Sequence, residues 1–426
     1  MAGRSSTPLF GARLSAGYSQ EKLAAKLGVE RSTVGRWERG VQSPQPWQRR
    51  ALAAALQVSL DELDDLLHRT LRPSSLSLQD KPDGTLLVTG PAVSWQPPED
   101  GESSIAPDLD VIHAAIPRLR RALDSLDLPD DGPTRSLADL RLDIVRASDD
   151  RLQSRYVDLA RRLPSLIPEI ARAGQLGDAI GRRQAASLLT LALRAADGVA
   201  FKFGYLDLSA RLIDLMRSAA QVAEDPLLQA TVAYVRTEAF FATGDLDTAA
   251  RALDLAADQV PTRGALSATA AAALGALHMR AAVVAGRAGK ADAASDHLRE
   301  ARRAAHAVSE GVYRGTAFGP SSLRIHELAV AVELRDPRGV QRAADWAPPP
   351  ELPAERRSHY YIDLARAQLD LGHRQDAYVC LQAARRAAPE HARTHPQVRQ
   401  SLSALLRTHS APSSGLLDLA AWARAR

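Results

Sequence analysis

A pattern of glycine, alanine, leucine and alanine recurs in the second half of this 426-residue chain. The alanine, leucine and alanine follow the glycine at offsets of 5, 9 and 12 residues in GDLDTAARALDLA from Gly244, in GKADAASDHLREA from Gly289 and in GHRQDAYVCLQAA from Gly372. Steps of four and three residues place the three apolar side chains on one face of a helix. Since an apolar helical segment also precedes each glycine, the pattern predicts units of helix, glycine turn and helix, with alanines that allow close packing.

Two degenerate copies fit the same register, in FGYLDLSARLIDLM around Gly204 and in LRDPRGVQRAADWA around Arg335. The five register positions, 204, 244, 289, 335 and 372, are 40, 45, 46 and 37 residues apart. The pattern resembles the tetratricopeptide repeat, although the standard repeat is shorter, at about 34 residues. We therefore expect residues 109–426 to form a less regular α-solenoid of about five helical pairs, with further helices between residues 109 and 190.

The first 71 residues contain short helical patterns separated by turn signals. After LFGARLSAG these are SQEKLAAKLG, VERSTVGRWERG, a segment from Trp47 to Leu56 and SLDELDDLL. They predict a compact five-helix domain at residues 1–71, and the whole chain is predicted to be all-α. Residues 72–108, rich in proline and acidic side chains, read as a linker that holds one strand-like run, TLLVTG at 85–90.

The segment VERSTVGRWERG, residues 29–40, has two different faces. Val34 and Trp37 are three residues apart and can hold the helix to its domain. The other faces carry hydrogen-bond donors, at Arg31, Ser32, Thr33 and Arg36. Because residues near the start of a recognition helix reach deepest into the major groove, Arg31 and Ser32 are the predicted base readers, and an arginine favours guanine in each half-site. Gly40 lets the chain turn after the helix.

Charge and composition agree with a nucleic-acid-binding module. Residues 1–60 hold nine Lys/Arg and three Asp/Glu, a net charge of +6, which leaves −2 for the rest of a chain whose total is +4. Such a local basic excess is typical of nucleic-acid binding. The single cysteine, Cys380, excludes an intramolecular disulfide, and neither a signal peptide nor an apolar run of membrane-spanning length is recognised. A cytoplasmic protein that is not inserted in a membrane is expected.

SQEKLAAKLGVERSTVGRWERGVQSPQP resembles the Cro/repressor type of helix-turn-helix, the XRE class, over residues 9–67. The resemblance implies that Gln20 and, near the last turn, Arg39 contact phosphate, while Arg31, Ser32 and Arg36 touch bases. It also implies a homodimer bound to an inverted-repeat operator in double-stranded DNA, and hence a nucleoid-associated regulator. The first helix departs from the family pattern, because LFGARLSAG, with Gly11, replaces the usual run of Arg and Leu.

The C-terminal half has a resemblance of its own. FGPSSLRIHELAVAVELRDP, ERRSHYYIDLARAQLDLG and AAPEHARTHPQVRQSLSALL are similar to the sensor half of actinobacterial XRE regulators with tetratricopeptide-like domains. The architecture is also similar to that of peptide-responsive quorum-sensing regulators of Gram-positive bacteria. A Thr-Asn pair often follows FGP in the actinobacterial group, where this chain has Ser321 and Ser322. These resemblances imply that the repeats sense a peptide or small-molecule effector. Because the short N-terminal domain has little spare apolar surface, the repeats are also expected to form the dimer contact.

A solenoid offers a concave groove lined by the first helix of each pair. The candidate ligand-binding residues of this groove are Tyr234, Arg236, Thr237, His278, Arg324, His326, Tyr360 and Tyr361. Each of them has an alternative as a packed or solvated side chain. A ligand that shifts the repeats between two curvatures would change the spacing of two DNA-binding heads and so alter DNA affinity.

Other patterns predict neither a metal, a cofactor nor an enzyme. His391 and His395 are spaced as in half of a zinc site, but with no third ligand recognised and Pro396 adjacent they are expected at the surface. GRAGKAD, residues 286–292, lacks the spacing of a phosphate-binding loop and already serves as a repeat turn. Two function classes remain: a ligand-sensing transcriptional regulator, and a repeat scaffold that docks a partner protein while the helix-turn-helix anchors it to DNA.

Overall fold

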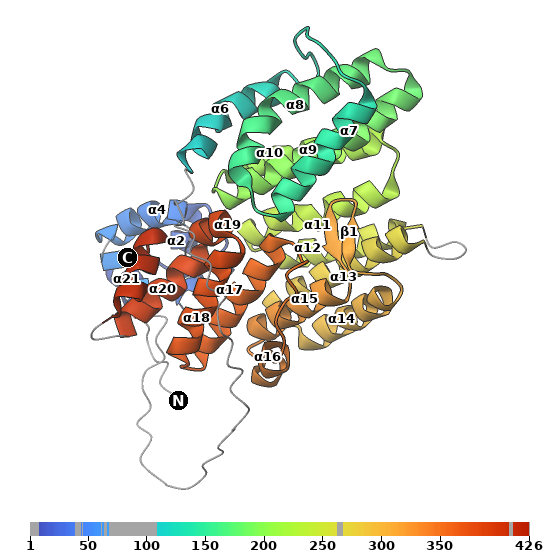
Figure 1. Ribbon diagram of the computed structural model, residues 1–426. Coiled ribbons are helices and arrows are strands. Elements are labelled where there is room, and N and C mark those ends of the chain that lie inside the picture. The colour runs from blue at the N-terminus through green and yellow to red at the C-terminus, as the bar shows by residue number, and fades with distance from the viewer. Residues whose placement is uncertain are drawn as a thin grey trace. The chain divides into compact units, whose positions relative to one another are not determined.

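The computed structural model describes residues 8–38, 44, 46–60, 62–63, 66–67, 109–261, 267–408 and 412–425. The chain divides into two compact units, Met1–Asp100 and Gly101–Arg426, and the division falls within the predicted linker. The linker, 72–108, and its strand-like run, 85–90, lie outside the described residues, as do Arg39 and Gly40. Figure 1 shows that both units are built almost entirely of helices.

The N-terminal unit contains α1 (Pro8–Ser15), α2 (Gln20–Leu27), α3 (Arg31–Glu38) and α4 (Pro46–Leu56). Within the predicted fifth helix, residues 62–63 and 66–67 are described and are helical. Ser19 begins α2 by accepting a hydrogen bond from the backbone N–H of Lys22, and Gly28 ends it with a φ of 66°. The core includes Val34, Trp37 and Leu52, each at most 1% exposed, so it forms around the α3 face that periodicity predicts.

The C-terminal unit consists of consecutive helices that follow one another from cyan through yellow to red in Figure 1. They are α6 (Asp110–Asp124), α7 (Leu137–Leu152), α8 (Tyr156–Leu176), α9 (Ala179–Lys202), α10 (Leu206–Val222), α11 (Pro226–Thr243), α12 (Leu246–Gln259), α13 (Ala268–Arg287), α14 (Ala291–His306), α15 (Pro320–Glu333), α16 (Pro337–Ala344), α17 (Ala354–Asp370), α18 (Arg374–Ala387), α19 (Pro389–Thr394), α20 (Pro396–Thr408) and α21 (Ser414–Trp422). Among the described residues one helix, α13, is long and apolar enough to span a membrane, and it is mostly buried within the unit.

The five predicted turn positions all separate the two helices of a hairpin, and all have a positive φ. The angles are 82°, 78°, 72°, 53° and 81° at Gly204, Gly244, Gly289, Arg335 and Gly372. This conformation suits glycine because it has no Cβ, and at position 335 an arginine adopts it. The helical hairpins predicted at these positions, from α9/α10 to α17/α18, are confirmed.

The repeated alanines and leucines fill the contacts between the helices of each hairpin. Ala249, Ala294 and Ala377, at offset 5 from their glycines, are 0% exposed. Leu253 and Leu381, at offset 9, are 1% exposed. Small side chains at the crossing let the two helix backbones approach closely, and the leucine fills the space beside them.

A short β-hairpin that periodicity did not predict lies between α14 and α15. Its strands, β1 (Gly311–Tyr313) and β2 (Thr316–Phe318), are antiparallel and pair Val312 with Ala317. Phe318 is fully buried against Gly275 of α13, where an added Cβ would lie 1.9 Å from the Phe318 ring. The hairpin is therefore packed into the helices.

The series of hairpins curls until its first members contact its last. The backbone N–H of Ala354, the first residue of α17, donates to Gln153 after α7 over 3.2 Å, and the N–H of Val157 in α8 donates to Glu390 of α19 over 3.0 Å. Rotations between successive repeats add up along a solenoid, which accounts for such closure. Side chains of early and late helices therefore meet in the interior.

Candidate functional site

The outer face of α3 presents the side chains that the sequence assigns to DNA recognition. Arg31 and Ser32 are exposed at its N-terminus, and Thr33 and Arg36 are partly exposed, while Val34 and Trp37 are each 1% exposed. Arg31 contacts Glu21 of α2 at 3.4 Å, with 66% and 70% of the two side chains exposed. An ion pair this open to water is weak, so the guanidinium is available to another partner.

Two further donors of α3 lie beside one another. The Ser32 hydroxyl donates to the carboxylate of Glu30 over 3.1 Å, and Arg36 donates to the backbone and side-chain oxygens of Ser32 over 3.4 Å each. These exposed contacts align the Ser32 and Arg36 side chains along the open face of the helix. Together with Arg31 they present a row of hydroxyl and guanidinium donors.

Gln20 makes a contact that sequence reasoning missed. Its side-chain amide donates to Glu38 at the end of α3, and the guanidinium of Arg13 in α1 forms an ion pair with the same carboxylate. Arg13 and Glu38 are 4% and 5% exposed. This buried pair holds the atypical first helix against α3. The glutamate of the Trp-Glu-x-Gly motif, Glu38, is the sequence feature from which the contact could have been predicted.

Residues 11–63 match a helix-turn-helix family model. The match supports an XRE-type helix-turn-helix in this segment. The match supports a DNA-binding transcriptional regulator. It covers about an eighth of the chain and none of the repeats. No curated protein and no solved structure matches the chain significantly.

In the repeat unit, the interior holds a group of cations around the phenol of Tyr234 in α11. Arg356 of α17 donates to the Tyr234 hydroxyl over 3.2 Å, and the guanidinium of Arg280 in α13 lies 4.2 Å from the ring centroid. Arg194 of α9 lies 6.0 Å from the same centroid. Burial would raise the pKa of Tyr234, but the charges of Arg280, Arg356 and Arg194 outweigh it and lower the pKa to about 8.

A small pocket of about 10 Å³, room for about one water molecule, lies between α11, α13 and the β-hairpin. Its polar lining includes Tyr234, Thr231, Arg314 and Thr316, and much of the remainder is alanine. Arg194 donates to the Thr316 hydroxyl over 2.7 Å and so connects the hairpin to the cations around Tyr234. The position of these cations favours an anionic group on any small molecule that enters the pocket.

The predicted groove residues do not all come together. Tyr234 and His326 do, because Arg356 reaches both, at 3.2 Å from the Tyr234 hydroxyl and 3.4 Å from Nε2 of His326. Arg324 lies elsewhere and stacks on the ring of Trp346, 4.8 Å from its centroid.

The other predicted groove residues have partners of their own. Tyr360 is 1% exposed and its hydroxyl donates to the carbonyl of Ala343, and its ring contacts that of Tyr361 at 5.3 Å. Thr237 is buried and donates to the carbonyl of Tyr234 in its own helix. The remaining two make side-chain contacts, Arg236 with Phe240 at 5.2 Å and His278 with His297 at 3.1 Å.

The serines after the FGP motif bind a nearby carboxylate. The backbone N–H groups of Ser321 and Ser322 donate to Glu310 over 2.8 and 3.0 Å, and the Ser322 hydroxyl donates to its other oxygen. Glu310 thereby supplies a negative charge at the N-terminus of α15, where the helix dipole favours one. In this structure Ser321 and Ser322 therefore hold a carboxylate at the start of α15.

A second interior cluster surrounds Lys202, the last residue of α9. Its ammonium group donates to Glu355 over 3.1 Å and to Nε2 of His359 and His391 over 3.1 and 3.3 Å. Burial would raise the pKa of Glu355, but Lys202 and Arg151 outweigh it and lower the pKa to about 2. One ammonium group thus joins α9 to α17 and α19.

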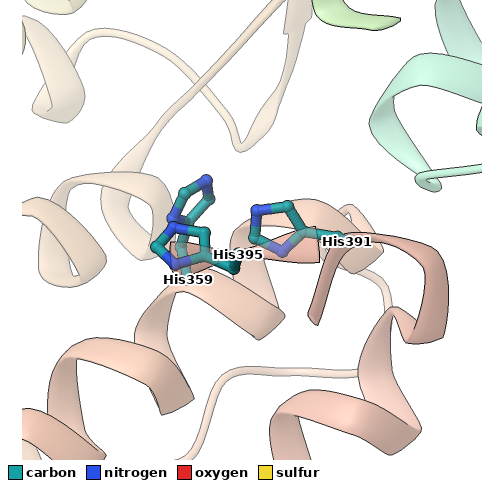
Figure 2. Close-up of side chains that lie close together, drawn as sticks. All are labelled: His359, His391 and His395. Carbon is teal, nitrogen blue, oxygen red and sulfur yellow. The ribbon is translucent and has the colours of Figure 1, made fainter. Parts of the chain in front are cut away.

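His391 and His395 are not isolated surface residues, and that expectation is wrong. His391 is fully buried, and the ring of His359 lies 4.4 Å from its ring and 5.4 Å from that of His395. Figure 2 shows the three rings gathered at one point. The packing of α17 beside α19 supplies the third histidine, which sequence spacing could not place. Burial and then the charge of Lys202 lower the pKa of each, to about 3 for His395.

Proposed function

We propose that the chain is a sequence-specific transcriptional regulator that binds an inverted-repeat operator as a homodimer through α3. The observation that carries this is the exposed row of donors at the N-terminus of α3, in a domain that matches the helix-turn-helix family. Arg31 and Ser32 stand where base readers of such a helix stand. Arg36 and Thr33 extend the row, and Gln20 would reach a phosphate by leaving Glu38.

Operator selection from random duplexes, followed by binding measurements at fixed salt, tests base reading. Arg31→Ala should cost about 1–3 kcal/mol on the selected site and little on random DNA, because a bidentate guanine contact is lost. The matched control is Lys22→Ala, on the exposed surface of the neighbouring helix. An equal loss on both duplexes for Arg31→Ala would contradict base reading.

We propose further that the repeat unit supplies the dimer contact. Large apolar side chains are exposed in and between its first helices, at Leu128, Leu142, Val145, Leu176, Ile180 and Val222. Exposed apolar surface of this kind marks protein interfaces. Light scattering should give a dimer for the wild type and a monomer for Leu142→Glu/Val145→Glu. If the double variant is still a dimer, the dimer contact does not include Leu142 and Val145.

For the sensed effector we propose a small anionic molecule in the pocket beside Tyr234. The pocket has room for about one water molecule, so a compact anion is favoured over an extended peptide, and α11, α13 and the β-hairpin have to move apart to admit it. Thermal-shift and DNA-binding screens of carboxylates and phosphates should find a compound whose effect is lost in Tyr234→Phe and Arg314→Ala. The control is Arg324→Ala/Tyr361→Ala, whose residues do not line this pocket. If no compound changes DNA affinity, the partner-docking scaffold becomes the better reading.

A further inference from the structure

Two pairs of metal-ligating side chains face one another at the Lys202 cluster. Glu355 and His359 are four residues apart on α17, and His391 and His395 are four apart at α19 and its C-terminal cap. Side chains at this spacing project from one face of a helix, and histidine pairs so spaced bind zinc. The second pair comes from a different helix, and the three histidines gather at one point (Figure 2), with Glu355 beside His359.

The distances suit one metal ion. The ligand nitrogens of the three histidines all lie within 4.8 Å of one another. With Zn–N bonds of about 2.0–2.1 Å, ligand atoms around a tetrahedral zinc lie about 3.3 Å apart. Modest ring rotations therefore bring the three nitrogens onto one ion. Oε1 of Glu355 lies 3.9 Å from Nε2 of His359 and can be the fourth ligand.

The surroundings orient His391 as a ligand. Its Nδ1 lies 2.9 Å from the Ser358 hydroxyl oxygen, and both residues are 0% exposed. Since the Lys202 ammonium can only donate, Nε2 of His391 is an acceptor and Nδ1 carries the proton that Ser358 accepts. Metal-bound histidines commonly donate their second nitrogen to an oxygen in this way. The Nε2 lone pair consequently points into the cluster.

Lys202 shows that the cluster is arranged around a positive charge. Its ammonium lies 3.1 and 3.3 Å from Nε2 of His359 and His391, and it is the group that a metal ion has to displace. The lysine has a long flexible stem, and 15% of its side chain is exposed. Its withdrawal would free Oε1 of Glu355 and the histidine nitrogens for a metal ion, while Arg151 keeps its contact with Oε2 of Glu355.

We propose that His359, His391 and His395, with Glu355, bind one divalent transition-metal ion of the Zn²⁺ type in exchange for the Lys202 ammonium. Three imidazole ligands suit Zn²⁺, Co²⁺ and Ni²⁺ rather than Mg²⁺ or Ca²⁺, which prefer sites made of oxygen ligands. Because Lys202 comes from α9 and the ligands come from α17 and α19, metal binding would replace the Lys202 link between α9 and these two helices with a link between α17 and α19. The proposal does not depend on DNA binding or on the pocket beside Tyr234.

The test uses the full chain, stripped of metal with a chelator and titrated with Zn²⁺ in a calorimeter and with Co²⁺ by visible absorption. One ion per chain and the intense bands of tetrahedral Co²⁺ are expected. Ser358→Ala should weaken binding about 10–100-fold, as losing a group that orients a ligand does. His395→Gln removes a ligand outright and should weaken binding at least as much.

The matched control is His278→Gln/His297→Gln. Nδ1 atoms of this pair lie 3.1 Å apart in a different part of the repeats, and its removal should leave the titration unchanged. Lys202→Met should bind metal more tightly than the wild type, because the competing ammonium is gone. Circular dichroism confirms that each variant is folded before it is titrated.

Three results would overturn the proposal. The first is a wild type that takes up neither Zn²⁺ nor Co²⁺. The second is an affinity unchanged by both Ser358→Ala and His395→Gln. The third is a folded Lys202→Met variant that binds metal more weakly than the wild type, since Lys202 would then support the site instead of competing for it.

Discussion

The outer face of α3 and the interior of the repeat unit use the same kinds of side chain in opposite ways. Arg31, with 66% of its side chain exposed, has a loose contact with Glu21 at 3.4 Å. Glu355, with 13% exposed, contacts Lys202 at 3.1 Å and Arg151 at 3.6 Å. A charge in water needs no partner, whereas a buried charge is costly unless it is paired. The first region is therefore available to DNA, and the second holds helices together.

The largest expected difference comes from removing one charge in each region. Glu355→Gln leaves Lys202 and Arg151 buried without their carboxylate and should destabilise the chain by about 3–5 kcal/mol. Glu21→Gln breaks only the exposed pair and should change stability by less than about 1 kcal/mol. Urea unfolding followed by circular dichroism measures both. Equal effects would remove the distinction between the two regions.

Close packing of the β-hairpin predicts the next effect. Gly275→Ala places a Cβ 1.9 Å from the buried ring of Phe318 and should cost about 1–3 kcal/mol through overpacking. The control is Gly286→Ala on the same helix, where the nearest atom would be 3.6 Å away. That alanine should be neutral or slightly stabilising, because it improves helix propensity. Thermal unfolding of the two variants compares them directly.

Acid should destabilise the repeat unit more than the N-terminal unit. Burial holds the pKa of His391 well below its ordinary value of about 6.5. Above pH 6.5 the imidazole is therefore neutral in both the folded and the unfolded state, and its protonation costs no stability. Below pH 6.5 the imidazole of His391 is protonated in the unfolded state but stays neutral in the folded state. This histidine alone should then remove about 1.4 kcal/mol of stability per pH unit.

The helices α1 to α4 of the N-terminal unit give the control for that prediction, since the first histidine of the chain, His68, comes after them. Hydrogen exchange of the full chain, corrected for intrinsic rates at pH 7 and pH 5.5, should show loosening in α17 and α19 and not in α2 and α3. His391→Gln should make the pH dependence in the repeats less steep, and His359 and His395, whose pKa values are also lowered, should account for what is left. Uniform loosening of both units would argue against this origin.

The smallest expected effect is that of Arg31→Ala on stability. Its side chain is mostly exposed and its ion pair is long, so the free energy of unfolding should change by less than about 0.5 kcal/mol. The same substitution is expected to weaken operator binding, so function and stability would be separated at one residue. A clear loss of stability would show that Arg31 serves the fold.

Local features were readable from the sequence because they depend on neighbours along the chain. The α3 face follows from the three-residue step between Val34 and Trp37, and the repeat turns follow from residues such as Gly244 that adopt positive φ without strain. Two similar turns, with φ of 58° at Ser154 and 53° at Glu224, were missed since neither carries a glycine.

The residues that meet inside the repeats were decided only by tertiary structure. Lys202 contacts His391, 189 positions later in the chain, and Arg356 contacts Tyr234, 122 positions earlier. Periodicity and turn residues specify that hairpins form and which face of each is apolar. They do not specify the rotation from one hairpin to the next, which comes from side-chain packing at every interface and accumulates along the series. That accumulated rotation closes the repeats and brings Lys202 of α9 to the three histidines, whose own meeting comes from the packing of α17 beside α19.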